Sequence, residues 1–329
     1  MSKKVAVVTG ASGYIGSMLC NELVNRGWTV YGIYRNAEMS VPSHPNFIPV
    51  VCSFTYVTIN QLDKVGFDRE HGVDVFFHLA WETKYRSNPM MQTNCAIGLL
   101  NYFMGDQMNK LKVKTFVFGS SFIRFGYDYG DGWASDPETA YYGGAKSFCT
   151  HTLKMYAATS DAPRFIEVIL TNVYGPHSRG RFLDNIVNSA VDNRIITTSS
   201  NCKQLYDFVH ETDAVDAIIY IAEWHPKDKA CGSYIIKGNK FDYTLKDYIN
   251  NIAIEAGIPR DNVFLGRKMV IDHLDTGYRD FVRDATMLGW CPIVNFDEGI
   301  RELIKLRKGE SWLSRISNGV KQILKAVIK

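Results

Sequence analysis

The stretch VAVVTGASGYIG (5–16) determines how the rest of the sequence is interpreted. An apolar, β-rich run stops at Gly10, and two further glycines, Gly13 and Gly16, follow at intervals of three. From there apolar residues recur at helical spacing until Gly27, a typical stop for a helix. The pattern predicts a strand, a glycine-rich turn and a helix over residues 5–27.

The same alternation of apolar runs and helix-like segments continues through the first half of the chain. Continuous apolar strands separated by helices indicate a parallel sheet that is covered on both faces. The sequence therefore predicts an α/β fold with a Rossmann-type, doubly wound parallel sheet. The further predicted strands are WTVYGIY (28–34), FIPVV (47–51), VDVFFHLA (73–80), KTFVFGS (114–120) and RFIEVILTNVYGP (164–176).

The second half is less regular. We expect a helix over 181–194 and a short strand that runs into a helix over 204–224. The prediction is a dinucleotide-binding Rossmann domain over 1–175 and a mainly substrate-binding, smaller lobe over 176–329. The lobe is expected to interleave with the sheet, to which segments near 206–225 return.

Composition excludes several classes of protein. The net charge of +3 is too small to indicate a nucleic-acid partner, and no window approaches the 18 apolar residues of a transmembrane helix. The seven cysteines are scattered and contain no CxxC, which argues against a disulfide framework or a structural metal site and favours a reducing compartment. The start MSKKVAVVTG lacks the features of a signal peptide, so we expect a cytoplasmic protein.

The tail over 311–329 is basic and amphipathic. It predicts a terminal helix that packs on the domain or a partner, with a membrane-surface helix as the alternative.

The glycine-rich turn predicts a dinucleotide site. Glycines in a first strand–turn–helix unit allow the backbone to approach a pyrophosphate closely and present the helix N-terminus to it. The second strand ends in YGIYRNAE (31–38), where Arg35 follows the strand and no carboxylate stands at Ile33 or Tyr34. A guanidinium matches the 2′-phosphate of NADP, so NADP(H) is favoured, with NAD(H) possible; a solvated surface arginine is the alternative for Arg35.

AYYGGAKSFCT (140–150) places Tyr142 and Lys146 four positions apart. Alone, this spacing is equally typical of two neighbours on a helix surface. A tyrosine hydroxyl titrates near pH ~10, and an ammonium one helical turn away favours the phenolate. Such a tyrosine can exchange a proton with a substrate hydroxyl while a nicotinamide moves hydride.

Several segments, in this order, resemble the extended short-chain dehydrogenase/reductase family, in particular its nucleotide-sugar epimerase/dehydratase/reductase group. The matching segments are TGASGYIG (9–16), DVFFHLA (74–80), Asn94, GSS (119–121), YGGAK (142–146), NVYGP (172–176), YDFVHETD (206–213) and LGWCP (288–292).

The resemblance implies a catalytic set of Ser121, Tyr142 and Lys146. The family's serine lies five residues before a glycine, and in SSFIRFG that glycine is Gly126, which selects Ser121. Carried over by position, the cofactor site comprises Gly10, Ser12, Gly13, Tyr14, Ile15, Gly16, Arg35, Ser53, Leu79, Ala80, Trp81, Tyr142, Lys146 and Leu170. The implied substrate residues are Ser120, Ser121, Asn172, Arg179, Arg181 and Tyr206.

Departures from the family pattern reduce the range of reactions that we expect of this chain. The family's dehydratases carry an acid and a base directly after the catalytic serine or threonine, where this chain has Phe122 and Ile123. Ser53 stands where the family usually has an aspartate facing the adenine. Tyr206 replaces an arginine that holds the nucleotide diphosphate, and Arg179 and Arg181 are candidate substitutes.

The reaction class that remains is hydride transfer at a single carbon of the sugar. We expect an NADPH-dependent reductase of a nucleotide-linked 4-keto (deoxy)sugar, acting at C4 with Tyr142 as the acid/base. The alternatives are an NAD-dependent nucleotide-sugar 4-epimerase and a non-catalytic dinucleotide-binding regulator. A homodimer is also expected. The family's four-helix dimer contact is one explanation for the apolar residues Leu99, Leu100, Phe103 and Met104, together with the helix that contains Tyr156, and packing in the core explains them equally well.

Overall fold

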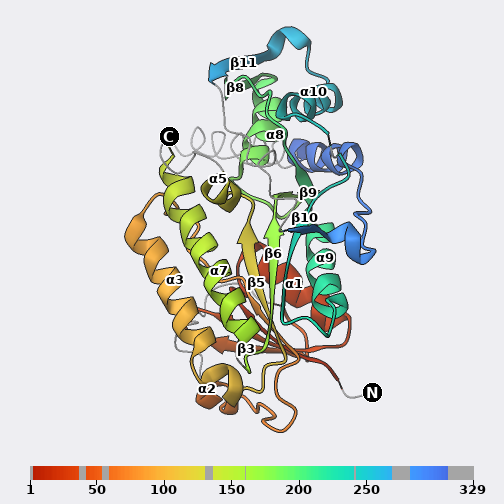
Figure 1. Cartoon of the computed structure of the whole chain (residues 1–329). Helices are drawn as coiled ribbons and strands as arrows, with labels where there is room; N and C mark the ends of the chain where they lie inside the picture. Colours follow the sequence, from red (N-terminus) through yellow and green to blue (C-terminus); the bar gives the residue numbers. More distant parts are fainter. Residues whose placement is uncertain are drawn as a thin grey trace, which may run out of the picture. The chain divides into compact units, whose positions relative to one another are not determined.

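The computed structural model describes residues 3–36, 42–53, 59–129, 136–159, 161–240, 242–268 and 282–309 (Figure 1). By their contacts these residues form two compact units. The first contains residues 3–171, Thr212–Lys237 and 282–291, within the described ranges. The second contains Asn172–Glu211, 238–268 and 292–309, again within those ranges. The chain therefore leaves the first unit and returns to it twice.

The first unit is built on an eight-stranded sheet in which every neighbouring pair of strands is parallel. The strand order is β12-β10-β6-β5-β4-β1-β2-β3. Its strands are β1 (Val5–Thr9), β2 (Thr29–Tyr34), β3 (Phe47–Val51), β4 (Val75–His78), β5 (Thr115–Ser121), β6 (Arg164–Leu170), β10 (Cys231–Ile236) and β12 (Arg283–Asp284).

Helices connect these strands. Those of the first unit are α1 (Tyr14–Asn25), α2 (Ile59–Asp63), α3 (Pro89–Met104), α4 (Gln107–Lys110), α5 (Arg124–Asp128), a π-helical segment η2 (Glu138–Gly143), α7 (Gly144–Thr159), most of α9 (Glu211–Trp224), and the 3-10 turn η5 (Ala285–Leu288).

Two small parallel sheets belong to the second unit, one of β7 (Asn172–Tyr174) with β9 (Phe208–His210) and one of β8 (Ile196–Ser200) with β11 (Val263–Lys268). Its helices are α8 (Phe182–Asn193), α10 (Leu245–Ala256), the 3-10 turn η3 (Arg260–Asn262) and a helix over 296–309.

The order of strands reverses at β1, which pairs with β2 on one side and with β4 on the other. Connections from the two sides of β1 leave for opposite faces of the sheet, so a crevice opens beyond its carboxyl end. Parallel strands also bring every carboxyl end to the same edge. The segments that follow β1, β2, β3, β4 and β5 therefore meet around this crevice.

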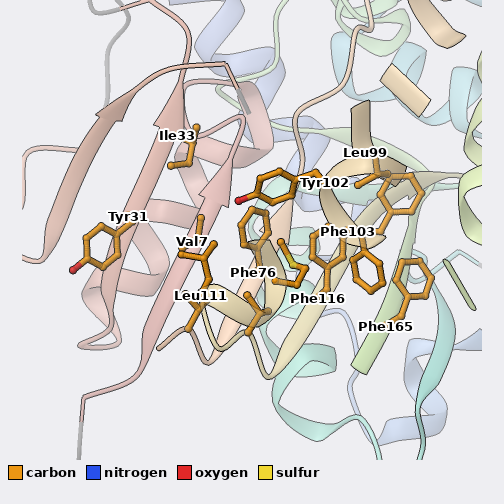
Figure 2. Close-up of a cluster of buried hydrophobic side chains, with 14 of the residues drawn as sticks. Val7, Tyr31, Ile33, Phe76, Leu99, Tyr102, Phe103, Leu111, Phe116 and Phe165 are labelled. Atoms are coloured by element: carbon orange, nitrogen blue, oxygen red, sulfur yellow. The ribbon is translucent and has the colours of Figure 1, made fainter. Parts of the chain in front are cut away.

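Aromatic residues fill the core between the sheet and the helices α3 and α7, which run side by side on one face of the sheet (Figure 1, Figure 2). Phe116 of β5 packs on Phe76 of β4 with ring centroids 5.2 Å apart and on Phe103 of α3 at 4.7 Å. The opposite face is covered by α1 and α9, which an ion pair between Arg26 and Asp216 joins at 2.6 Å. Burial on both faces explains why the strands are continuously apolar.

The sequence patterns predicted the central strands correctly, with one difference. Residues 164–176 form two strands, because β7 leaves the main sheet and pairs with β9 in the second unit. The patterns missed β10 and β12, which extend the main sheet beyond β6. In the part of the chain that is described, no helix has the length and apolarity needed to cross a membrane. The tail over 311–329 lies outside the described residues.

Candidate active site

The turn between β1 and α1 is closed so tightly that only glycine fits at two positions. Gly10 has a φ of +74°, and a Cβ atom placed there would lie 3.0 Å from the amide nitrogen of Ala80. A Cβ atom on Gly16 would lie 2.0 Å from the carbonyl oxygen of Gly10. The same oxygen accepts a hydrogen bond from the Gly13 amide at 2.8 Å. Glycine at these two positions therefore lets the turn pack directly on the end of β4 and on the first turn of α1, which is the compact strand–turn–helix geometry typical of a pyrophosphate site.

The N-terminus of α1 is suited to hold an anion. Gly13 occupies the N-cap position, is exposed, and offers no capping side chain to the first amides of the helix. Ser12, Tyr14 and Ile15 are half-buried around this terminus. The first N–H groups of a helix have no acceptor within the helix, and together with the helix dipole they favour a phosphate at such a terminus.

The other predicted cofactor residues lie at the carboxyl ends of neighbouring strands. Arg35 is exposed directly after β2, and Ser53 follows β3. Leu79, Ala80 and Trp81 follow β4, and Leu170 ends β6. Because all these strands are parallel, the residues share one edge of the sheet with the glycine-rich turn.

A buried polar contact fixes β1 to the end of β4. The hydroxyl of Thr9 lies 3.0 Å from Nδ1 of His78 and accepts a hydrogen bond from the Ala80 amide at 3.3 Å. Burial lowers the pKa of His78 to about 3, with the nearby Lys146 ammonium as a second cause. His78 is therefore a neutral structural residue, and it holds the backbone that contacts Gly10.

Tyr142 lies in the π-helical segment η2, immediately before α7 begins. Its side chain is buried. Short π-helical turns are rare and often occur at functional sites. A Cβ atom at the next residue, Gly143, would lie 3.1 Å from the carbonyl oxygen of Ile123, so this segment packs directly on the residues that follow Ser121.

Lys146 is buried and faces the same end of β5. Its Nζ donates a hydrogen bond to the Gly119 carbonyl at 2.6 Å and lies 3.8 Å from the centre of the Trp81 ring. The Tyr142 ring centre is 5.8 Å from Nζ. Burial lowers the pKa of Lys146 to about 7. The Tyr–Lys pair is thus in the interior at the end of β5 and is not a helix-surface pair.

Ser121 is the last residue of β5 and is half-buried. Its Oγ accepts a hydrogen bond from the Ile123 amide at 3.4 Å. The Oγ of Ser120 is buried and has no hydrogen-bond partner among the described residues. Phe122 is buried in a small apolar cluster with Phe125.

Sequence reasoning missed Arg86, which lies on the loop before α3. Its guanidinium carbon is 5.1 Å from the centre of the Tyr142 ring, and it forms an ion pair with Glu138 at 2.6 Å. These two charged residues belong to the wall of a surface cavity of about 570 Å³ that residues 83–89 line. A loop arginine carries no periodic signal, so only the fold places it beside Tyr142.

Four predicted substrate residues belong to the second unit. Asn172 starts β7, where its side-chain oxygen accepts a hydrogen bond from the Tyr206 hydroxyl at 3.2 Å. Arg179 is exposed and donates to the carbonyls of Pro176, at 2.6 Å, and Ser178, at 2.8 Å. Arg181 is the N-cap residue of α8 and is also exposed. Asn172 and Tyr206 are thus in contact, and the two arginines lie between β7 and α8.

The residues of the first unit fit a nicotinamide dinucleotide. The glycine turn is too tightly packed for a Cβ atom at Gly10 or Gly16, the terminus of α1 has no side-chain cap, and Tyr142 and Lys146 lie beyond β5. The individual cofactor-binding and catalytic roles of these residues are predictions.

Comparisons with known proteins agree with this geometry. A family model described as the NAD dependent epimerase/dehydratase family matches residues 6–236. The CDP-abequose synthase of Salmonella muenchen is 21% identical over 318 residues, which cover 94% of this chain and 99% of that protein. Two solved structures, MoeE5 in complex with UDP-glucose and NAD (TM-score 0.69) and a UDP-galactose 4-epimerase (TM-score 0.66), are each 20% identical, and the match covers 93% of this chain and 99% of theirs. At such identities the two structures show a common fold.

The burial of Lys146 predicts a pH-dependent cost in stability. The pKa of Lys146 is about 7 in the folded chain against an ordinary value of 10.5. The unfolded chain therefore binds more protons between these pH values, and wild-type stability rises with pH across that window. We expect Lys146→Met to be more stable than the wild type by up to a few kcal/mol, at roughly 1.4 kcal/mol per pKa unit.

The gain should be largest below pH 7 and should disappear as the pH approaches 10.5. Urea unfolding of both proteins across this range measures it. Lys64→Met, at an exposed position, is the control and should show no such trend. A gain that does not vary with pH would contradict the assignment of the buried charge.

Proposed function

The chain belongs to the NAD dependent epimerase/dehydratase family, and we propose that it is an NADPH-dependent reductase of a nucleotide-linked 4-keto (deoxy)sugar. The observation that carries this proposal is the arrangement at the end of β5. Ser121, Tyr142 and Lys146 are all present there, and the two residues after Ser121 are not an acid and a base.

In the proposed reaction Tyr142 donates its phenolic proton to the oxygen at C4. Lys146, held at the end of β5 by the Gly119 carbonyl, stabilises the phenolate that remains. The Ser121 hydroxyl orients the same oxygen by a hydrogen bond. The bound dinucleotide supplies the hydride at C4. Gly10, Gly13, Gly16 and the N-terminus of α1 hold its pyrophosphate.

The residues after Ser121 favour reduction over dehydration. Elimination of water needs a second acid/base pair near the sugar. Phe122 is buried in an apolar cluster, and Ile123 has an aliphatic side chain. A relative named as a synthase of a CDP-linked sugar, CDP-abequose, agrees with a nucleotide-sugar substrate.

An NAD-dependent nucleotide-sugar 4-epimerase is the second candidate. It is favoured by the solved structures that share this fold, because one is a UDP-galactose 4-epimerase and another holds NAD. An epimerase retains its NAD and regenerates it in each turnover. The state of the dinucleotide in the purified protein therefore separates the two candidates.

The test of function is a panel of CDP-, UDP- and dTDP-linked 4-keto sugars with NADPH, followed by the loss of absorbance at 340 nm. We expect turnover with one of them and a roughly 10²- to 10⁴-fold lower kcat in Tyr142→Phe, since that variant lacks the proton donor. Tyr141→Phe changes the exposed neighbour and is the matched control, with unchanged kcat.

Two results would decide against the reductase, and a third would decide against the role of Tyr142. Retained NAD with interconversion of sugar epimers would establish the epimerase. Dinucleotide binding without turnover of any substrate would favour a regulator. Equal losses in both tyrosine variants would remove Tyr142 from its proposed role.

Arg35 is the proposed reader of the 2′-phosphate of NADP. It is exposed at the end of β2, where a guanidinium can pair with a phosphate in two parallel hydrogen bonds. We expect the wild type to bind NADPH more tightly than NADH and Arg35→Glu to reverse this preference, as measured by fluorescence titration. Arg267→Glu, at an exposed arginine of the second unit, should keep the wild-type preference.

We also propose a homodimer formed by the outer faces of α3 and α7. Of the candidate contacts, Leu99 and Phe103 are fully buried in the core, whereas Met104 is 42% exposed. The two helices lie side by side (Figure 1), and each presents large apolar side chains to solvent. An apolar surface of this kind is typical of a protein interface. The exposed residues are Met90, Met91, Ile97 and Met104 on α3 and Phe148 and Met155 on α7.

Charges introduced into this surface should dissociate the dimer. We expect the wild type to have twice the mass of the chain by light scattering and Phe148→Glu/Met155→Glu to have the mass of one chain. Ile254→Glu, at a residue of α10 that is 72% exposed, is the control and should not change the mass. A monomeric wild type would contradict the proposal.

A further inference from the structure

A carboxylate lies in the middle of the parallel sheet. Glu167 is on β6, is fully buried, and has apolar neighbours on its own strand. Its Oε1 accepts hydrogen bonds from Nε of Arg124 and from the Thr150 hydroxyl, both at 2.7 Å. Its Oε2 accepts from Nη2 of Arg124 at 3.0 Å and from the Ser233 hydroxyl at 2.5 Å. Each oxygen therefore has two donors.

Arg124 extends the cluster along α5. This arginine is also buried and forms a second ion pair, with Asp128 one helical turn later. Asp128 in turn accepts a hydrogen bond from the hydroxyl of Ser147 on α7. A buried ionic network thus joins β6 to α5 and α7. We name these residues, Arg124, Asp128, Ser147, Thr150, Glu167 and Ser233, the Glu167 network.

The network joins the two segments that carry the proposed catalytic groups. Arg124 follows Ser121 by three residues, and Ser147 directly follows Lys146. The start of α5 packs on the Tyr142 segment, since a Cβ atom on Gly143 would lie 3.4 Å from Cα of Arg124. A shift of Arg124 would therefore move Ser121 relative to Tyr142.

Stability alone does not account for such a network. Removing two charges from water is costly, and well-packed apolar residues of similar volume are often as stable as a buried ion pair or more so. The polar cluster does, however, have one set of satisfied hydrogen bonds, which favours a single arrangement of the elements it joins. Precise placement is also what a proton transfer requires.

We propose that Glu167 is a positioning residue: through Arg124 and Thr150 it fixes the distance between Ser121 and the Tyr142–Lys146 pair, and its charge supports the ammonium of Lys146. This inference rests on the proposed reductase function for its kinetic consequences. Its structural and electrostatic parts concern the protein without substrate.

The charge effect has a definite direction. Burial raises the pKa of Glu167, but Arg124, Lys154 on α7 and the hydroxyl donors hold it below its usual range, so Glu167 is ionised. Its negative charge raises the pKa of Lys146 and opposes burial, which lowers it. Loss of the charge should therefore lower the pKa of Lys146 further. The other titratable and charged groups that act on Lys146 are Cys149 on its own helix, Cys95 on α3, Arg86 on the preceding loop, and His78 on β4.

Glu167→Gln is the main test, because it removes the charge at nearly constant size. We expect kcat to fall roughly 10- to 100-fold while KM and the NADPH dissociation constant change less than about two-fold. The basic limb of the pH profile of kcat should move to lower pH. Tyr234→Phe, on the neighbouring strand β10, removes a buried hydrogen bond between Tyr234 and His225 and is the control for a general loss of stability. It should leave both kcat and the pH profile unchanged.

Thr150→Val separates geometry from charge. It removes the link from α7 to Glu167 and keeps the carboxylate, so kcat should fall without a shift of the pH profile. It also tests the proposal if Glu167→Gln does not fold. Folded variants with wild-type kcat and pH profile would overturn the inference, as would a change confined to KM.

A readout without substrate distinguishes this inference from the proposed function. NMR of the protein labelled with ¹³C-lysine, with the Lys146 signal assigned by its loss in Lys146→Met, gives the titration of Lys146 directly. We expect a lower midpoint in Glu167→Gln than in the wild type, even if no nucleotide sugar is turned over. An unchanged midpoint would overturn the electrostatic part, whereas a missing turnover with a shifted midpoint would reject only the reductase.

Discussion

Eight strands that run in one direction can be joined only by crossovers, and this constraint organises the whole first unit. Each strand must return over a face of the sheet, so both faces are covered and the central strands are mostly apolar. Every carboxyl end lies at the same edge. The reversal of strand order at β1 then opens a crevice at that edge, between loops that diverge to opposite faces. A ligand there meets backbone and side chains from five successive strands.

The same geometry explains why two charged groups of the first unit are buried. Lys146 and Glu167 lie where helices pack on the sheet, so each loses most of its hydration. Lys146 retains a hydrogen bond to Gly119 and contacts with aromatic rings, and burial still lowers its pKa to about 7. Glu167 is fully satisfied by hydrogen bonds and stays charged. The site thus combines one cation that is destabilised by its surroundings with one anion that is well compensated. Proteins often accept such a loss of stability at functional sites.

Local patterns allowed a large part of this arrangement to be predicted. The glycine spacing at Gly10, Gly13 and Gly16 depends on backbone space within one turn, and the Tyr142–Lys146 spacing depends on one helical turn. The contacts that complete the site are between residues far apart in the chain. Arg124 meets Glu167 across 43 residues, and Arg86 meets Glu138 across 52. No periodicity signals such pairs, because they depend on how β5 and β6 align and on how a loop folds back. A short strand such as β12, of two residues, is also too short for any pattern to identify.

The residues that follow Ser121 bear on the proposed reduction, because their contacts decide whether they could act as an acid and a base. Phe122 is in an apolar cluster on which Ile123 also packs, and Arg124 donates to Glu167 and Asp128, so all three residues after Ser121 make packing or ionic contacts. A side chain that is held inward in this way cannot also move a proton at the sugar. If the turn after Ser121 carried an acid and a base at Phe122 and Ile123, it would need polar side chains directed at the substrate, and the apolar cluster around Phe125 would lose both of these side chains. In this chain the turn instead holds Ser121 in place, and Tyr142 is the single acid/base group of the proposed reaction. That division of roles supports chemistry limited to one carbon. The proposed positioning role of Glu167 would also explain why the chain has a buried carboxylate there despite the cost of its desolvation.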